Sequence, residues 1–372
     1  MIPSILTQQT RQGVEDFLRM TFPISTPFFH GMLDRFLDED GEVFKGPYLS
    51  IQLPFRQGTS SSTFFPDVPL PFTPYVHQEQ AFRRLSGMQP RSTIIATGTG
   101  SGKTESFLYP ILEYCYRHRG KPGIKALIIY PMTALAHDQA GRLARMIWNT
   151  PTLRGHITAG LFVGQSEHEQ RLVMGRDGII TNKDTQRLTP PDILLTNYKM
   201  LDYLLIRPKD YSLWKNNGPE TLRFLVVDEL HTFDGAQGTD LACLVRRLKA
   251  RLHSPRDFLC CVGTSATLGS DDSQETLRAY ATKIFGEPFD EGAVLTESRI
   301  SAGEFLDNSL IAKIELVPAA QVQALQPEQY ESYRTYVQAQ HALWFDETIP
   351  AERFDDDDWG VAQFRLRVAR HQ

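Results

Sequence analysis

The sequence has few cysteines and lacks a long hydrophobic run. Its 372 residues include four cysteines, and no two of them have the C-x-x-C spacing typical of a zinc site. Unpaired thiols suit a reducing cytosol, so we expect a cytoplasmic protein. No apolar stretch is long enough to span a bilayer, and the N-terminus lacks a basic segment followed by an apolar one. We therefore expect neither a membrane anchor nor a secretion signal.

The sequence also lacks a strong excess of one charge. Its 39 Lys and Arg residues and 44 Asp and Glu residues give a net charge of −5. This balance excludes a polybasic protein that attracts nucleic acid over its whole surface, but it is compatible with a local basic groove. Hydrophobic residues make up 41% of the chain, which is enough for a packed core and excludes bulk disorder. The length fits about two to three domains.

A glycine-rich segment organises the rest of the chain. Residues 96–104 read A-T-G-T-G-S-G-K-T, between an apolar run at 93–96 and a helix expected at 104–118. A strand, a glycine-rich loop and Lys-Thr at a helix start form a phosphate-binding loop. Its glycines let backbone N–H groups approach an anion, and the helix N-terminus adds partial positive charge. The residues predicted to hold ATP are Thr99, Gly100, Ser101, Gly102, Lys103 and Thr104, of which Thr104 would offer its hydroxyl to Mg²⁺.

Position 97 departs from the strict form of this loop. The pattern G-x-x-x-x-G-K-[ST] requires glycine there, and this chain has Thr97. The shorter ending T-G-S-G-K-T fits a known variant. A glycine-rich turn that carries a lysine by chance is the alternative, so the rest of the chain has to decide between them.

Two carboxylates follow another apolar run. Residues 223–227, R-F-L-V-V, lead directly into D-E-L-H at 228–231. At the end of a strand beside the phosphate loop, Asp228 would hold Mg²⁺ and Glu229 would orient and polarise the attacking water. His231 would lie near the γ-phosphate. An acidic strand end with only a capping role is the alternative.

A third candidate element precedes the phosphate loop. Residues 75–78, Y-V-H-Q, open a helix that is expected to run to Leu85. The Gln78 amide can pair with the N6 donor and N7 acceptor of adenine, and the Tyr75 ring can stack on the base. The alternative is a solvated glutamine on an ordinary helix.

Apolar runs recur along the chain, and a polar motif follows each of them. The further expected strands are residues 126–130, 160–163, 192–196 and 258–262. Strands that alternate with helices, each with its motif at the carboxyl end, indicate an α/β domain with a mostly parallel sheet flanked by helices.

We expect this α/β domain to occupy residues 75–290. Residues 1–74 would form an accessory helix, at 5–20, and an extended arm rich in proline and phenylalanine. Residues 291–372 would form a C-terminal extension or the start of a further domain, with a helix near 320–344.

The ordered motifs resemble those of one family. T-G-S-G-K-T, Y-P-M-T-A-L, T-N-Y, D-E-L-H and S-A-T resemble motifs I, Ia, Ib, II and III of superfamily 2 DEAD/DEAH-box-like helicases. Residues 75–78 resemble the Q motif, and the resemblance covers roughly residues 75–270. The forms T-G-T-G-S-G-K-T-E and D-E-L-H-T-F-D-G-x-x-G are most similar to those of large bacterial DNA-repair and phage-defence helicases.

The resemblance implies a first RecA-like domain with two binding sides. One side would bind ATP and Mg²⁺, and the other would grip a nucleic-acid backbone without reading its bases. Carried over by position, the residues facing the strand would be Pro131, Thr133, Thr196 and Asn197, and those coupling the two sides would be Ser265 and Thr267.

The resemblance also implies a part that this chain does not carry. The second RecA-like domain of the family holds motifs IV to VI with a Q-x-x-G-R-x-G-R segment, and no such segment follows residue 270. The family's arginine finger comes from that domain, and such a finger is worth about 10³–10⁵ in rate. We therefore expect the N-terminal motor half of a longer protein, poorly active by itself.

The favoured function is an ATP-dependent DNA helicase or translocase that works in DNA repair or anti-phage defence, with partner proteins from either. Two alternatives stay open. An RNA helicase of the same superfamily would grip phosphates in the same way, and an ATP-gated clamp or scaffold would use the same site without separating strands. Binding to single-stranded DNA and RNA at matched salt distinguishes the first alternative, and an unwinding assay the second.

Overall fold

The computed structural model divides the chain into two compact units. One unit is Phe55–Arg299, here called the core, and the other combines Met1–Pro54 with Ile300–Gln372. The residues that the structure describes are 3–23, 26–38, 53–58, 64–164, 170–265, 271–301, 304, 321, 324–326 and 329–345.

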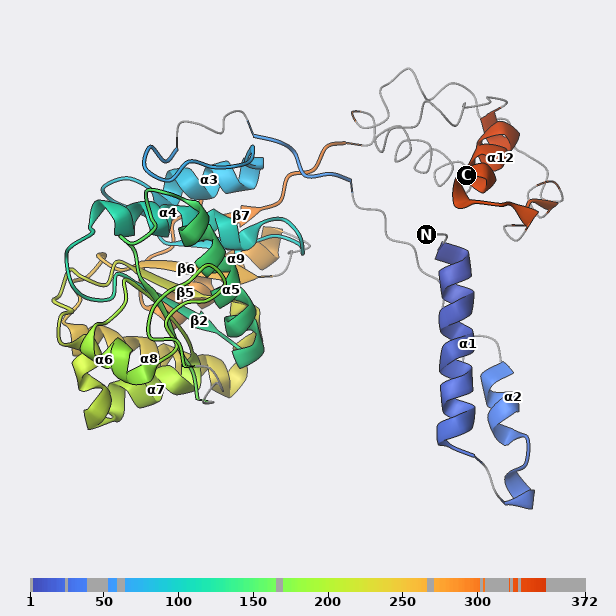
Figure 1. Ribbon diagram of the computed structural model, residues 1–372, viewed down its shortest axis with the longest axis horizontal. Helices are drawn as coiled ribbons and strands as arrows, with labels where there is room; N and C mark the ends of the chain where they lie inside the picture. The colour runs from blue at the N-terminus through green and yellow to red at the C-terminus, as the bar shows by residue number, and fades with distance from the viewer. Residues whose placement is uncertain are drawn as a thin grey trace. The chain divides into compact units, whose positions relative to one another are not determined.

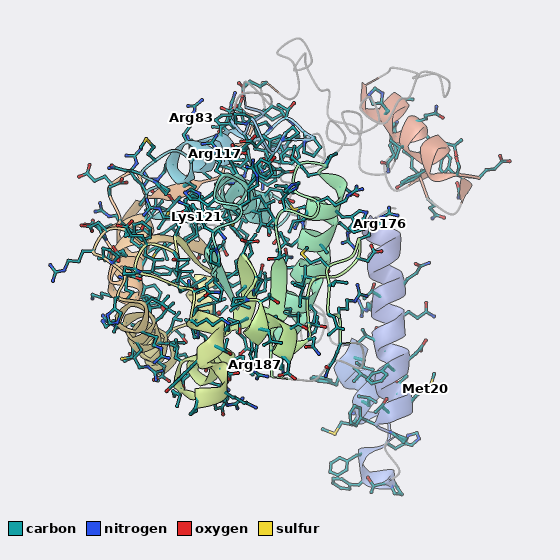
Figure 2. The ribbon with its side chains drawn as sticks, turned by 60° about the vertical axis from the view of Figure 1, so that its left-hand side comes forward. Met20, Arg83, Arg117, Lys121, Arg176 and Arg187 are labelled. Atoms are coloured by element: carbon teal, nitrogen blue, oxygen red, sulfur yellow. The ribbon has the colours of Figure 1, made fainter. Side chains whose placement is uncertain are left out.

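The named elements in the unit formed by the two ends of the chain are all helices. It contains α1 (Pro3–Thr21), η1 (Pro27–Phe29), α2 (Met32–Asp38) and α12 (Tyr333–Phe345). The helix expected at 5–20 lies within α1, and the one expected near 320–344 overlaps α12. Apolar side chains of α1 reach solvent, among them Met20, which is 79% exposed (Figure 2).

The core is built on a seven-stranded sheet in which every pairing is parallel. The strand order is β3-β4-β2-β5-β6-β1-β7. The strands are β1 (Thr93–Ala96), β2 (Ala126–Tyr130), β3 (Ala159–Phe162), β4 (Ile193–Asn197), β5 (Phe224–Val227), β6 (Cys260–Ser265) and β7 (Val294–Thr296). These short apolar runs form strands because helices cover both faces of the sheet, which favours continuous hydrophobic sequence over alternation.

The helices of the core lie on the two faces of this sheet (Figure 1). They are α3 (Val76–Leu85), α4 (Lys103–Arg117), α5 (Thr133–Asn149), α6 (Lys183–Leu188), α7 (Tyr198–Ile206), α8 (Gly235–Leu252) and α9 (Asp271–Phe285), with short turns η2 (Pro208–Trp214) and η3 (Leu230–Thr232). Side chains of α3, α4 and α5 pack on one face, and those of α7, α8 and α9 on the other. The expected α/β fold with a parallel, helix-flanked sheet is confirmed.

The strand order decides which loops become neighbours. Because all strands are parallel, their carboxyl ends share one edge of the sheet, here called the carboxyl edge. β6 lies between β1 and β5. The loop after β1 and the turn after β5, which holds Asp228 and Glu229 and is here called the acidic turn, therefore flank the end of β6. Segments more than a hundred residues apart thus meet at the carboxyl edge, as expected for ligand sites in such sheets.

The limits of the core differ from the span 75–290 expected for the α/β domain. The core includes residues 55–58 before α3, and β7 joins the sheet beyond residue 290. The functional domain limits stay predictions. Among the helices that the structure describes, none combines the length and apolar character needed to cross a bilayer.

Candidate nucleotide site

The loop between β1 and α4 has the backbone that a phosphate-binding loop needs. Gly100 and Gly102 have φ angles of 77° and 75°, a region that side chains rarely adopt. A Cβ atom on Gly102 would also lie 2.3 Å from Nε2 of Gln78. The positive φ therefore favours glycine at position 102, and a larger residue there would also displace the Gln78 amide.

Thr97 fits where the strict pattern has glycine. Among the described residues, those with positive φ do not include Thr97, so its backbone does not need glycine. Its side chain is buried, and its hydroxyl oxygen lies 2.6 Å from that of Ser101. The departure from the strict motif thus adds a hydrogen bond inside the loop.

The start of α3 holds the same loop from the side. Nε2 of Gln78 donates to the Gly102 carbonyl at 3.1 Å, and its Oε1 accepts from the Tyr75 amide at 2.9 Å. The Gln78 side chain is only 2% exposed. The amide nitrogen and the amide oxygen of Gln78 therefore both take part in joining the start of α3 to the loop. Adenine recognition by Gln78 and Tyr75 stays a prediction.

His77 provides a second contact from α3. Burial lowers the pKa of His77, so the ring is neutral, and Nε2–H donates to the Ser101 carbonyl at 2.8 Å. The Tyr75 ring stacks on it with centroids 5.6 Å apart. Nδ1 of His77 is buried without a hydrogen-bond partner, so an acceptor remains available beside the loop.

The predicted catalytic residues meet at the carboxyl edge. Nζ of Lys103, in the first turn of α4, lies 3.8 Å from Oε1 of Glu229, in the turn after β5. The same ammonium donates to the Ser265 carbonyl at the end of β6, at 3.3 Å. Both charged side chains are partly shielded, with exposures of 17% and 31%. One ammonium therefore faces the acidic turn across the end of β6.

Thr264 ties the two carboxylate residues to β6. Its hydroxyl donates to Oδ1 of Asp228 and accepts from the backbone N–H of Glu229 at 2.9 Å. The Glu229 backbone has φ 50° and ψ 50°, a left-handed conformation that is costly for a residue with a side chain. Such local strain is typical of functional sites, and here it turns the Glu229 side chain out of the strand line beside Lys103.

His231 lies on the outer side of this group. Its Nδ1 is 3.5 Å from Oε2 of Glu229 and 3.3 Å from Oγ of Ser265. A histidine and a carboxylate from the turn after β5, and a hydroxyl from the end of β6, thus form one connected set. Thr267, predicted to couple the two sides together with Ser265, lies outside the described residues.

The acidic turn has the chemistry to accept a divalent cation. Burial raises the pKa of Asp228, and the neighbouring Glu229 carboxylate adds to the rise, because two negative charges share one ammonium. A magnesium ion would relieve this excess of negative charge, and carboxylate and hydroxyl oxygens are its usual ligands. Asp228, and Thr104 directly after Lys103, carry oxygen atoms of this kind.

The residues predicted to face nucleic acid lie at the ends of β2 and β4. Nδ2 of Asn197 donates to Oγ1 of Thr133 at 3.2 Å, so the two elements are linked there. Pro131, Thr133 and Asn197 are half-buried, whereas Thr196 is fully buried and donates to the Phe162 carbonyl at 2.6 Å. Contact with nucleic acid stays a prediction for all four.

Three residues of the site escaped the sequence analysis. Thr264 stands one position before the S-A-T motif, so the motif could have led to it. His77 lies inside the Tyr75–Gln78 segment but was assigned no role. Glu297, whose Oε2 accepts from the Gly98 amide at 2.6 Å, is 199 residues from its partner, and no local pattern marks it.

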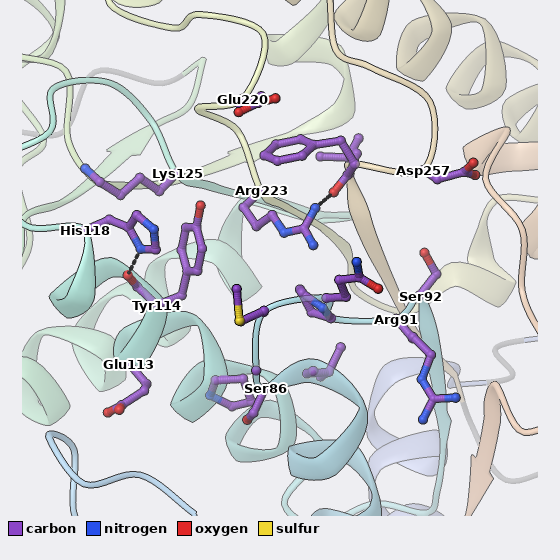
Figure 3. A pocket seen from close by; sticks show the side chains of 18 of the residues that line it. Ser86, Arg91, Ser92, Glu113, Tyr114, His118, Lys125, Glu220, Arg223 and Asp257 are labelled. Carbon is purple, nitrogen blue, oxygen red and sulfur yellow. Dashed lines mark hydrogen bonds between the residues drawn. The ribbon is translucent and has the colours of Figure 1, made fainter.

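A large cavity lies at the opposite edge of the sheet. It has a volume of about 1520 Å³ and is lined by residues that precede strands, such as Ser92, Lys125 and Arg223 (Figure 3). There Tyr114 stacks on His118 with ring centroids 4.0 Å apart, and Arg223 donates to the Phe258 carbonyl. None of the predicted site residues lines this cavity, so cavity size does not locate the nucleotide site.

Comparison with known proteins decides the family. The model of the DEAD/DEAH box helicase family matches residues 75–276, more than half of the chain. The chain belongs to this family. The parallel sheet with its phosphate loop after β1 is accordingly the RecA-like fold of a DEAD/DEAH box helicase.

Two curated relatives are much longer than this DEAD/DEAH box helicase chain. Druantia protein DruE of Escherichia coli is 28% identical over 54% of this chain, which spans 16% of the relative. The uncharacterized ATP-dependent helicase MJ1574 of Methanocaldococcus jannaschii is 28% identical over 61% of this chain, which spans 32% of it. A crystal structure of the DUF1998 helicase MrfA bound to DNA and AMPPNP aligns at 23% identity and a TM-score of 0.46, covering 66% of this chain and 30% of that one.

Proposed function

We propose that this chain is the ATP-binding motor half of a DNA helicase or translocase. The observation that carries the proposal is the 3.8 Å approach of the Lys103 ammonium to the Glu229 carboxylate at the carboxyl edge. A phosphate-binding lysine and a carboxylate that can polarise water meet where a triphosphate would extend from the glycine-rich loop.

The chemistry follows from this geometry. Lys103 and the loop amides bind the β- and γ-phosphates, and Glu229 orients the attacking water and accepts its proton. Asp228 and Thr104 would hold Mg²⁺, which would neutralise charge on the phosphates. His231 contacts both Glu229 and Ser265. It is therefore suited to respond to the loss of the γ-phosphate beside Glu229 and to transmit the resulting shift to the end of β6.

The nucleic-acid side lies along the ends of β2 and β4. Asn197 and Thr133, linked by a hydrogen bond, would contact strand phosphates together with Pro131 and Thr196. DNA is favoured over RNA because the forms of the Lys103 and Asp228 motifs resemble those of DNA-repair and phage-defence helicases. Work in one of these two pathways, with partner proteins from it, belongs to the proposal.

Movement along the strand requires a second RecA-like domain. In this family a cleft between two such domains closes on ATP, and the second one supplies the arginine finger. The chain covers only 16% and 32% of the relatives described above, which supports a motor half that works within a longer protein. We expect the 372 residues alone to bind ATP weakly and to hydrolyse it slowly.

The proposal is tested on the protein in which this chain is joined to a second RecA-like domain. We expect ATP hydrolysis that single-stranded DNA stimulates more than single-stranded RNA at equal salt. Lys103→Ala and Glu229→Gln should each lower turnover by about 10²–10⁴-fold, while Lys121→Ala at the opposite edge leaves it unchanged. Turnover at the wild-type rate in Glu229→Gln would refute the assignment. Stimulation by RNA alone, or binding without unwinding, would replace the DNA motor with one of the two alternatives.

A further inference from the structure

Glu297 contacts the phosphate-binding loop from a distant part of the chain. Directly after β7, its Oε2 accepts from the Gly98 amide at 2.6 Å, and its Oε1 accepts from Nε of Arg299 at 2.7 Å. Its side chain is 15% exposed, and that of Arg299 is 20% exposed. A partly buried carboxylate bound to a backbone N–H is a charge-assisted hydrogen bond, which is stronger than a neutral one.

The ion pair explains how a carboxylate can lie beside a loop that binds anions. Arg299 neutralises Glu297, so the pair as a whole does not repel a triphosphate. Gly98 and Gly100 give this part of the loop high conformational freedom. Fixing the Gly98 amide restricts that freedom before ATP arrives, which lowers the ordering cost of binding.

The segment that carries Glu297 is paired with the segment that enters the core. Phe55 and Arg299 form an antiparallel bridge, and the Arg56 amide donates to the Ser298 carbonyl at 2.8 Å. The Arg299 guanidinium also lies 4.0 Å from the Phe55 ring centre. We call residues 55–58 together with 298–299 the paired ribbon.

The paired ribbon is fixed to the start of α3 as well. The Val76 amide donates to the Arg56 carbonyl at 3.0 Å, and the Gly58 amide donates to the Pro74 carbonyl at 2.8 Å. The chain enters the core at Phe55 and leaves it at Arg299. Both covalent connections of the core therefore run through the paired ribbon, which is anchored to the nucleotide site by Glu297 and α3.

We propose that Glu297 is a positioning residue that orders the phosphate-binding loop and couples it to the paired ribbon. This inference rests on the proposed function as an ATP-driven motor, because the coupling matters only if the loop binds a nucleotide. Glu297 does not touch the reacting atoms. Glu297 sets the conformation of the loop before ATP binds. When ATP binding changes the conformation of the loop, Glu297 transmits this change to the two segments that connect the core to the rest of the chain.

The positioning role is tested first without nucleotide, on the 372-residue chain. Hydrogen exchange at the Gly98 amide should be about tenfold faster in Glu297→Ala than in the wild type, since a charge-assisted hydrogen bond is lost. Glu297→Gln, which keeps an acceptor oxygen, should lie between the two. Glu291→Gln, an exposed carboxylate three residues before β7, is the matched control. Unchanged exchange in both Glu297 variants would overturn the proposal.

Nucleotide binding supplies the second readout. Glu297→Ala should raise the Kd for a fluorescent Mg²⁺–ATP analogue by about tenfold, and Glu297→Gln by less, while both variants stay folded at the assay temperature. In turnover assays with a second RecA-like domain attached, KM should rise while kcat stays within about twofold, because the interaction is made before the transition state. A fall in kcat with unchanged KM would contradict a positioning role in binding.

The coupling is tested at the paired ribbon. In the wild type, the ATP analogue should slow hydrogen exchange at the Arg56 amide, and this slowing should be lost in Glu297→Ala. If the analogue binds and Arg56 exchange stays the same, the coupling is refuted. If the wild type binds no nucleotide at all, the proposed function fails, whereas exchange at Gly98 still decides whether Glu297 orders the loop.

Discussion

A single hydroxyl sets the geometry of the two carboxylates that we propose to be catalytic. Thr264 donates to Asp228 and accepts from the Glu229 amide, so β6 fixes both residues of the neighbouring strand end. The left-handed backbone of Glu229, with φ 50°, needs such a partner, because this conformation is unfavourable by about 1–2 kcal/mol without support. Thr264 therefore acts through Glu229 rather than on the nucleotide.

Replacing Thr264 by valine keeps the shape of the side chain and removes the hydroxyl. We expect kcat for ATP hydrolysis to fall about 10- to 100-fold, because Glu229 loses its amide partner and its orientation, while KM changes little. Steady-state kinetics on the protein with both RecA-like domains measures this. Thr239→Val, which removes an exposed hydroxyl from α8, is the control, and equal kinetics for both variants would contradict the role of Thr264.

Asp228 is placed where its charge is unfavourable for folding. Burial raises its pKa, and the hydrogen bond from Thr264 offsets this only in part. Because the folded-state pKa lies above the unfolded one, ionising this group costs folding free energy at every pH above the folded-state pKa. The cost disappears as the pH falls below the unfolded value of 3.8.

Asp228→Asn should therefore stabilise the protein while it removes activity. Without Mg²⁺ at neutral pH we expect a higher melting temperature than in the wild type, and the difference should shrink as the pH is lowered toward 4. Thermal unfolding followed by circular dichroism at several pH values measures it. A lower melting temperature for the variant at neutral pH would show that the carboxylate is not strained in this way.

At the scale of elements, the parallel strands are the part most readily predicted from sequence. Runs such as residues 126–130 and 223–227 are apolar throughout because helices cover both faces, and a polar motif marks the end of each. β7 was not predicted because its three residues, V-L-T, carry no such signal. Helices α6 and α7 were not expected either. α6 is a polar helix of six residues, and α7 is an apolar helix that begins directly after β4, so hydrophobic runs alone do not separate it from the strand.

Only the site residues that belong to local sequence motifs could be predicted. Lys103, Asp228 and Glu229 belong to local patterns, and the parallel order of strands explains why they meet. The hydrogen bonds that hold them come from other elements. Gln78 contacts Gly102 across 24 residues and Glu297 contacts Gly98 across 199, and such pairings depend on packing that a single sequence does not reveal.

Gly263 in β6 packs closely against Leu230 in η3, directly after the acidic turn. A Cβ atom on Gly263 would lie 2.8 Å from Cδ2 of the buried Leu230, next to Glu229. Gly263→Ala should destabilise the fold by about 1–3 kcal/mol, as overpacking does, and should lower kcat by displacing η3. Denaturant unfolding measures the first effect.

Gly164 provides the matched control for this prediction. A Cβ atom there would lie 3.6 Å from Cε of Met200, an ordinary van der Waals contact. Gly164→Ala should be close to wild type in stability and turnover. Equal stability of the two variants would mean that Leu230 moves freely and that β6 does not constrain the acidic turn.

At the scale of the whole molecule, the core contains every residue described at the candidate nucleotide site. All seven strands and both hydrophobic clusters lie within Phe55–Arg299. We expect residues 55–299 produced alone to unfold cooperatively and to bind an Mg²⁺–ATP analogue within about twofold of the 372-residue chain, since none of the contacts described at the loop comes from the other unit. Non-cooperative unfolding of this piece would show that the terminal unit is needed for the fold.

We propose that Lys103, Asp228 and Glu229 converge on one triphosphate at the carboxyl edge of the sheet. Calorimetric titration of the 372-residue chain with Mg²⁺–ATP tests it most directly, with Lys103→Ala compared against Lys121→Ala at the opposite edge. We expect saturable binding that is lost in Lys103→Ala and kept in Lys121→Ala. Binding of equal strength in the wild type and Lys103→Ala would contradict it.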